Sequence, residues 1–294
     1  MSAPKLIAVM GPTASGKSHV AETLAERLDA VIINADAFQI YRGMDIGTAK
    51  PAHENRDRYR LLDLKNPDED FGVGEYVLLA ADLLQELFHK GRNVILCGGT
   101  GLYIRALLEE YKDLMPAPSA DLRQRIGQMT LDAAVTQLIE TAPEIAAKTD
   151  LKNEIRVKRA LEKISSDSRP LQFTIPPFQI QKIAIVPHVD ISQKKIMQRT
   201  KEMVQNGWVA EVKELIIKGY GPGDPGFRAL GYEAIARYVQ EGGDEGQLIQ
   251  EIELDTVKYA KRQRTWLRAE PNLIVFNEVS EALDAIEPQA RRES

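Results

Sequence analysis

Runs of consecutive apolar residues along the chain predict buried β-strands. They lie at residues 5–10, 30–34, 93–97, 182–186 and 273–276, and most show no alternation of polar and apolar positions. Strands that are buried on both faces have this pattern, which is typical of a parallel sheet covered by helices on its two sides. The pattern therefore predicts a parallel sheet.

Helical periodicity fills most of the segments between these runs. The expected helices are 17–28, 75–90, 102–110, 192–206, 209–219, 232–240 and 247–267. Strands that alternate with helices indicate a doubly wound α/β core. The predicted fold class is therefore α/β, with a parallel sheet flanked by helices.

The segment 116–168 departs from this alternation. It contains no strand signal, and its apolar residues recur at helical spacing. It begins at the turn-like sequence "MPAPS" and ends at "SSDSRP". We expect an inserted α-helical domain at 116–168, within a core formed by residues 1–115 and 169–294.

Composition narrows the class of protein. The 294 residues are 44% hydrophobic and 28% charged, and no apolar run reaches the roughly 20 residues that cross a bilayer. The single cysteine excludes an internal disulfide, and the four histidines lack the spacing of metal ligands. These features predict a cytoplasmic protein without a membrane segment.

Charge bears on the possible partners. The net charge of −5 argues against a nucleic acid, because phosphate backbones are bound through Lys and Arg. Two windows are locally basic, however. Residues 148–169 include seven Lys or Arg against four Asp or Glu, and residues 256–268 include five against none. Each window is either an ordinary solvated helix face or part of a basic surface that binds nucleic acid.

The sequence "GPTASGKS" follows the first apolar run and leads into the first predicted helix. It matches the G-x-x-x-x-G-K-[ST] phosphate-binding loop in the strand-to-helix context that this motif requires. Its glycines let backbone N–H groups converge on phosphate oxygens, its lysine neutralises charge, and its serine can ligate Mg²⁺. The predicted phosphate-binding residues are Gly11, Pro12, Thr13, Ala14, Ser15, Gly16, Lys17 and Ser18, with Ser18 as the metal ligand.

The phosphate loop alone does not identify the reaction. The base-reading sequence Asn-Lys-x-Asp of GTPases is absent, which disfavours that class. Three kinds of chemistry remain open. They are phosphoryl transfer by a kinase that binds ATP, nucleotide-driven switching, and a reaction in which diphosphate is the leaving group.

Two polar residues follow later strands, at the edge where α/β sheets bind ligands. Asp36 follows the second apolar run, and Thr100 follows the third in "CGGTGLYIRALLE". Asp36 is a candidate general base or a carboxylate that supports a magnesium ion, but an Asx turn or a helix cap is an equal alternative. Gly98 and Gly99 predict a flexible turn that brings the Thr100 hydroxyl to the same crevice.

Several motifs together extend this picture. In chain order they are "GPTASGKS", "DAFQIYRGMDIGTAKP", "PDEDF", "GGTGLYIRALLE", "RALE", "RPL", "ALGYEAI" and "YAKRQRTWLR". Over residues 5–270 the chain resembles the tRNA dimethylallyltransferases, the isopentenyltransferase family. The string ending in "YRGMDIGTAKP" is specific to that family, whereas the phosphate loop is not.

The resemblance implies a P-loop NTPase-like core with a helical insertion. It implies transfer of a dimethylallyl group from dimethylallyl diphosphate to N6 of the adenosine immediately 3′ of the tRNA anticodon. Asp36 would be the general base with Thr100 beside it, and Arg228 would contact the diphosphate opposite the loop. We expect Mg²⁺ as the cofactor and a monomeric chain. The residues expected to contact tRNA are Asp36, Ala37, Phe38, Gln39, Thr100, Arg123, Ile155, Arg156, Val157, Lys158 and Arg159.

The chain departs from the family pattern at three places. Ala37 stands where the family usually has serine, Tyr59 and Arg60 replace a histidine pair, and Lys195 replaces a common arginine. These changes affect the expected substrate contacts more than the expected reaction. A small-molecule or nucleotide kinase and a nucleotide-driven RNA-binding switch remain the alternatives.

Overall fold

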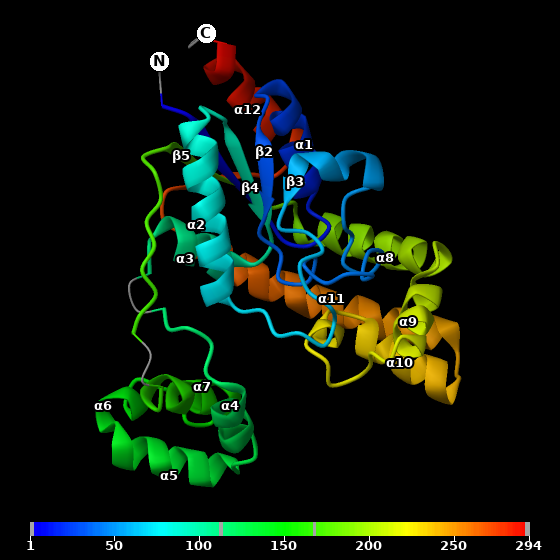
Figure 1. Ribbon diagram of the computed structural model, residues 1–294. Coiled ribbons are helices and arrows are strands. Elements are labelled where there is room, and N and C mark those ends of the chain that lie inside the picture. The colour runs from blue at the N-terminus through cyan, green and yellow to red at the C-terminus, as the bar shows by residue number, and fades with distance from the viewer. Residues whose placement is uncertain (1–2, 112–113, 167–168, 292–294) are drawn as a thin grey trace. The chain divides into compact units, whose positions relative to one another are not determined.

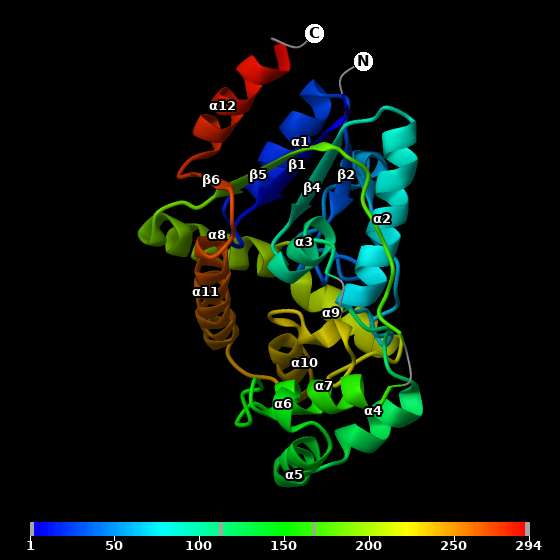
Figure 2. The ribbon, with the colours of Figure 1, turned by 90° about the vertical axis from the view of Figure 1, so that its left-hand side faces the viewer.

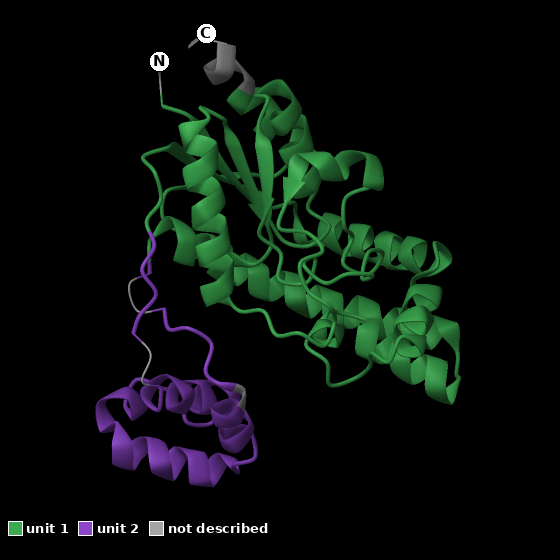
Figure 3. Cartoon of the chain, viewed as in Figure 1, with its two compact units in different colours: residues 1–110, 174–294 green, residues 111–173 purple. Residues whose placement is uncertain are grey.

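The computed structural model describes residues 3–111, 114–166 and 169–291 (Figure 1). The chain forms two compact units, one of residues 1–110 with 174–294 and one of residues 111–173 (Figure 3). The segment 116–168, expected to be helical from its sequence, lies within the second unit.

The first unit is built around a six-stranded sheet in which each strand is parallel to its neighbours. Its strands are β1 (Lys5–Met10), β2 (Val31–Asn34), β3 (Tyr59–Arg60), β4 (Val94–Gly98), β5 (Gln179–Ile185) and β6 (Leu273–Phe276). Their spatial order is β3-β2-β4-β1-β5-β6. The apolar runs correctly predict five of these strands. They miss β3, which is two residues long and pairs with β2 alone.

Helices cover both faces of the sheet (Figure 2). The helices α1 (Lys17–Arg27) and α12 (Val279–Arg291) lie over one face, and α2 (Val73–His89) and α3 (Gly101–Leu108) lie over the other. Apolar side chains of α1 and α12 join strand residues in one core. This double cover explains why the strands are continuous apolar runs.

Further helices lie beyond the carboxyl ends of the strands (Figure 1). They are α8 (Val189–Gln205), α9 (Trp208–Ile217), α10 (Tyr232–Glu241) and α11 (Glu245–Arg268), with the short 3₁₀ helices η1 (His53–Arg58) and η2 (Gly226–Arg228). Their buried side chains form a second core around Trp208 and Tyr232, which also includes Ile40 and Met44 from the loop after β2. The loop after β2 is therefore packed against the C-terminal helices.

The second unit contains α4 (Ala120–Gly127), α5 (Leu131–Thr141), α6 (Pro143–Ala146) and α7 (Glu154–Ile164). Three of these helices begin at a polar residue whose side chain accepts a hydrogen bond from the first turn: Ser119, Thr130 and Asn153. Their apolar faces form a small core of their own. Across the described parts of both units, no helix is long and apolar enough to cross a membrane.

Candidate active site

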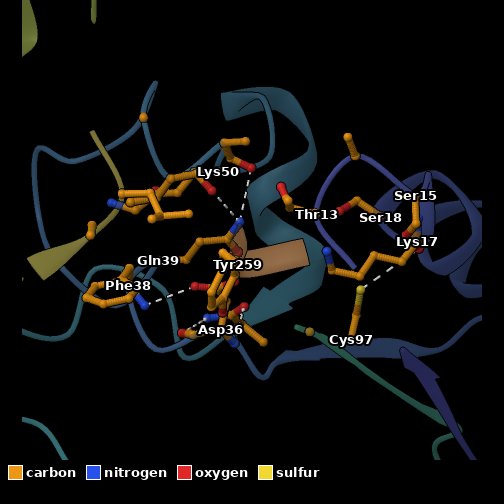
Figure 4. A pocket seen from close by; sticks show the side chains of 18 of the residues that line it. Thr13, Ser15, Lys17, Ser18, Asp36, Phe38, Gln39, Lys50, Cys97 and Tyr259 are labelled. Atoms are coloured by element: carbon orange, nitrogen blue, oxygen red, sulfur yellow. Dashed lines mark hydrogen bonds between the residues drawn. The ribbon is translucent and has the colours of Figure 1, made fainter. Parts of the chain in front are cut away.

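A cavity of about 540 Å³ opens where β1, β2 and β4 end (Figure 4). Parallel α/β sheets bind ligands at this edge. The cavity brings together many of the residues predicted from sequence: Thr13, Ala14, Ser15, Gly16, Lys17, Ser18, Asp36, Phe38, Gln39 and Arg228. Gly11, Pro12, Ala37 and Thr100 are not part of its lining.

The phosphate loop has the backbone shape of an anion site. Gly16 adopts a left-handed conformation with φ of 92° directly before α1, a conformation that glycine adopts without a steric cost. The N–H groups of Ala14, Gly16 and Ser18 donate to no group among the described residues. Free amides at a helix N-terminus favour negative charge, so the loop can hold a phosphate or a diphosphate.

A buried glutamine on α11 forms a hydrogen bond to the phosphate loop. Gln263 Oε1 accepts the N–H of Thr13 at 2.8 Å, and its Nε2 donates to Gly99 O at 3.0 Å. Gln263 thus joins the phosphate loop to the end of β4. The motif "YAKRQRTWLR" contains this residue, but only the tertiary contact reveals its role.

The cavity lining is rich in cations. Within the described residues it carries five Lys or Arg side chains and one carboxylate, that of Asp36. Burial lowers the pKa of Lys17, and the neighbouring Asp36 acts in the opposite direction. Burial also lowers the pKa of Arg199 on α8, again opposed by Asp36. Arg199 was not predicted, because nothing near it in the sequence marks it as a ligand. Lys50 is paired with Asp45 and Asp63, which do not line the cavity. The positive charge of the remaining four cations still exceeds the negative charge of Asp36 and favours a polyanion in the cavity.

Asp36 forms the Asx turn that its sequence context allowed as an alternative. Its Oδ1 accepts the N–H of Phe38 at 3.0 Å. Its Oδ2 accepts no hydrogen bond within the described residues. Lys17 extends from α1 toward the side of the cavity where Asp36 lies (Figure 4). The turn therefore uses one carboxylate oxygen, and the other remains available to a ligand.

Thr100 supports the backbone next to Asp36. Its Oγ1 accepts the N–H of Ala37 at 3.0 Å, and its own N–H donates to Ala35 O at 3.2 Å. Neither Thr100 nor Ala37 lines the cavity. In this structure the Thr100 hydroxyl holds the segment after β2 in place.

The expectation of a flexible turn at Gly98 and Gly99 is corrected. A Cβ atom on Gly98 would lie 2.1 Å from Ala35 O, and one on Gly99 would lie 2.4 Å from Gln263 Nε2. Neither glycine has a positive φ. Gly98 is required because the backbone of Ala35 approaches too closely for a side chain, and a side chain at Gly99 would displace the amide of Gln263.

Aromatic and apolar side chains complete the cavity wall, among them Phe38, Tyr59 and Tyr259. Tyr59 is buried, and its hydroxyl donates a hydrogen bond to Glu22 Oε1 at 2.9 Å. Burial raises the pKa of the Tyr59 hydroxyl, so the side chain is a neutral wall of the site. A cavity lined by both cations and aromatic rings suits a ligand that is both phosphorylated and hydrophobic.

The other predicted RNA contacts lie in the second unit. On α7, Ile155 is 74% exposed, and the side chains of Arg156 and Arg159 are 67% and 57% exposed. Arg123 lies on α4 and is partly buried. Lys158 is largely buried, because its Nζ donates to Gly127 O at 2.7 Å.

Val157 requires a correction. It is fully buried in the core of the helical unit, next to residues such as Leu161 one turn further along α7. Its side chain therefore packs in the core of the helical unit and is not accessible to RNA. Ile155, Arg156 and Arg159 are exposed, whereas Val157 is buried and Lys158 partly buried, as expected when one face of the helix packs against the core and the other faces solvent.

The fold and the cavity define a class of protein. The phosphate loop follows β1 in the middle of the sheet, and Asp36 follows β2, the next strand in the sequence. Both line a cavity rich in cations. This arrangement is a P-loop NTPase-like core with a site for a phosphorylated ligand. The IPP transferase family matches residues 39–270, and the chain belongs to this family.

Curated relatives of this chain are named tRNA dimethylallyltransferases. That of Picosynechococcus sp. is 38% identical over 279 residues, which are 93% of each chain. That of Gloeobacter violaceus is 36% identical over 275 residues, which are 92% of this chain and 91% of the relative. Among solved structures, the tRNA isopentenylpyrophosphate transferase of Bacillus halodurans superposes with a TM-score of 0.71 at 31% identity, covering 98% of this chain and 97% of that one.

Proposed function

We propose that the protein transfers a dimethylallyl group from dimethylallyl diphosphate to N6 of the adenosine immediately 3′ of the anticodon in tRNA, and releases diphosphate. The observation that carries the proposal is the cavity itself, in a chain that belongs to the IPP transferase family. Its cations suit a diphosphate and its aromatic side chains suit a prenyl group. None of the relatives named above is a kinase.

The diphosphate end of the cavity stabilises the leaving group. Breaking the allylic C–O bond moves negative charge onto the departing diphosphate and leaves an allyl cation. Lys17, Arg199 and Arg228 line the same cavity as the phosphate loop, and we propose that they face the place where this charge develops. Donors fixed in this way stabilise the transition state more than the ground state.

Asp36 is the general base of the proposed reaction. The adenine N6 forms a bond to the allylic carbon as the C–O bond breaks, and the N6 proton passes to a carboxylate oxygen. Asp36 Oδ2 is suited to accept it because it has no other hydrogen bond within the described residues. Such a base contributes through proton transfer in the bond-forming step.

Mg²⁺ is the proposed cofactor, held by Ser18 and oxygens of the diphosphate. Ser18 fits this role because it is exposed at the start of α1, lines the cavity, and has a side-chain hydroxyl without a hydrogen bond in the described residues. When bound, a divalent cation would neutralise charge on the leaving diphosphate. Among the described residues, no group of three or more His, Cys, Asp or Glu side chains could hold a metal, so the other ligands would be substrate oxygens and water.

The helical unit is the proposed RNA-binding surface. An adenine inside a stacked anticodon loop must leave the stack to reach a buried prenyl donor. The exposed cations Arg156 and Arg159, with Arg123, would contact the RNA backbone. We propose that the chain acts as a monomer in the cytoplasm, where tRNA is available.

Mass analysis of nucleosides tests the proposal directly. The protein is incubated with Mg²⁺, tRNA lacking the modification and either dimethylallyl diphosphate or ATP, and the digested RNA is analysed. We expect an adenosine heavier by one dimethylallyl group with dimethylallyl diphosphate alone. A phosphorylated product formed from ATP, with no prenylated adenosine, would instead establish the kinase alternative.

A further inference from the structure

Glu211, on α9, ties together two walls of the cavity without lining it. Its Oε2 accepts the N–H groups of Asp45 and Ile46, both at 2.7 Å. Its Oε1 accepts the N–H of Gly47 at 3.3 Å and the hydroxyl of Tyr232 at 2.7 Å. One carboxylate thus receives four hydrogen bonds from two separate segments of the chain.

The first of these segments is residues 45–51, which form one wall of the cavity. Gly47, Thr48 and the residues up to Pro51 line the cavity directly. Three successive N–H groups at the start of this wall converge on Glu211, an arrangement that binds an anion. At the other end, Lys50 Nζ donates to Tyr41 O at 2.6 Å and to Asp45 Oδ1 at 2.8 Å. The wall is therefore held at both ends.

The second segment carries a cation of the site. Tyr232 begins α10 and follows Arg228, Ala229 and Leu230, all of which line the cavity. The hydroxyl of Tyr232, buried against Glu211, fixes the position of this segment relative to the wall. The Arg228 segment and the wall 45–51 are therefore connected through Glu211.

Close packing around this contact leaves little freedom for adjustment. A Cβ atom on Gly47 would lie 2.1 Å from Trp208 Nε1, and one on Gly231 would lie 2.3 Å from the same indole ring. Both segments thus lie directly on Trp208, three residues before Glu211. A shift of one segment must displace Trp208, and with it the other segment.

We propose that Glu211 is a positioning residue of the diphosphate site, which holds the wall 45–51 and the Arg228 segment at the separation that the donor substrate requires. This role rests on the proposed function for the identity of that substrate. A carboxylate suits it because all four facing groups are donors, and an ionised carboxylate is a pure acceptor. The amide of glutamine would direct its own N–H toward one of these donors.

Two variants test the role. In Glu211→Gln the KM for dimethylallyl diphosphate should rise by about tenfold or more, because hydrogen bonds to a charged group are lost. Tyr232→Phe removes the hydroxyl that joins the Arg228 segment to Glu211 and leaves the carboxylate in place, and the KM should rise by about fivefold. The matched control is Glu214→Gln, an exposed glutamate on the same helix, which should leave the KM unchanged. The KM for tRNA and kcat should change less than the KM for the donor.

A second measurement does not depend on activity. The affinity for inorganic diphosphate in the presence of Mg²⁺, measured by calorimetry, should fall in the same order of variants. Adding formate to Glu211→Ala supplies a small carboxylate and should restore part of this affinity, while chloride at equal ionic strength should not.

The outcomes separate the two proposals. A wild-type protein that binds diphosphate but prenylates no tRNA contradicts the proposed function and leaves this inference open to the calorimetric test. If Glu211→Gln is folded and keeps the wild-type KM and diphosphate affinity, Glu211 only packs the fold and the inference is wrong. A lower kcat at unchanged KM, as expected for partial unfolding, also contradicts it.

Discussion

The cavity of the first unit and the α7 surface of the second both carry arginines, but they hold them in different ways. Arg199 lines the cavity and is partly buried, and this burial lowers its pKa while Asp36 opposes that effect. Arg156 and Arg159 have mostly exposed side chains, and each lies near a carboxylate of its own unit, Asp150 at 3.9 Å or Glu162 at 2.7 Å. Solvent and salt therefore reach the second set freely.

This difference determines what each region can contribute. A buried cation in a fixed position acts strongly on one ligand geometry, because the surrounding dielectric is low. Exposed cations act on a whole phosphate backbone, each weakly, and their effect depends on salt. Substitutions in the cavity should therefore have large effects confined to one substrate or step, and substitutions on α7 should have small, additive effects.

The largest effect is expected at Asp36. Asp36→Asn keeps an oxygen that can accept the N–H of Phe38, so the turn seen in the structure should persist. It removes the proton acceptor. We expect the single-turnover rate of prenyl transfer to fall by roughly 10² to 10⁴, while the melting temperature and the affinity for dimethylallyl diphosphate stay near wild type. A folded variant that reacts at the wild-type rate would exclude Asp36 as the base.

The next effect is expected at Arg199. Arg199→Gln should weaken dimethylallyl diphosphate binding by about 10- to 100-fold, the range for losing a charge-assisted contact. The affinity for tRNA should change little, and Arg199→Lys, which keeps a positive charge, should be less affected. Calorimetry with each ligand gives the answer. An equal loss of affinity for both ligands would show that Arg199 does not act specifically on dimethylallyl diphosphate. It would contradict the proposed difference between the cavity and the α7 surface.

The same contrast explains what the sequence could predict. The phosphate loop, Asp36 and the strands β1, β2 and β4 are recognisable because each is a contiguous pattern whose meaning is local. Gln263 and Arg199 were missed because their functional neighbours are brought to them only by folding. Gln263 contacts Thr13, which is 250 residues away in the chain.

Errors in the sequence-based prediction have equally specific causes. Helix α12 was missed, although Ile286 is buried against the sheet core and Glu281 accepts the N–H groups of Asn277 and Glu278 at the start of the helix. Val157 was assigned with its neighbours as a block, yet Val157 and Leu161 lie four residues apart, the spacing of one helix face. That spacing could have identified Val157 as a core residue.

A smaller effect is expected on α7. Arg156→Ala and Arg159→Ala should each reduce tRNA affinity by a few-fold and lower the slope of log affinity against log salt by about one unit. The affinity for dimethylallyl diphosphate should not change. The control is Arg237→Ala. Arg237 is an exposed arginine of the first unit, where it pairs with Glu251 of the same unit. If both α7 variants bind tRNA with wild-type affinity at several salt concentrations, the RNA does not contact Arg156 and Arg159.

The smallest effect is expected at Ala37, the residue after Asp36, where the resemblance suggested serine. The structure uses the backbone of Ala37, whose N–H donates to Thr100 Oγ1 at 3.0 Å, and Ala37 does not line the cavity. Ala37→Ser should therefore change the single-turnover rate by no more than about twofold, since the new hydroxyl leaves the backbone contact in place. Thr100→Val, the matched variant, removes the acceptor of that N–H and should reduce the rate more, because an unpaired backbone donor next to Asp36 would disturb its position. A rate increase of tenfold or more in Ala37→Ser would instead mean that a hydroxyl at this position reaches the substrate, and that the region around Asp36 is less completely fixed by its own backbone than the hydrogen bonds indicate.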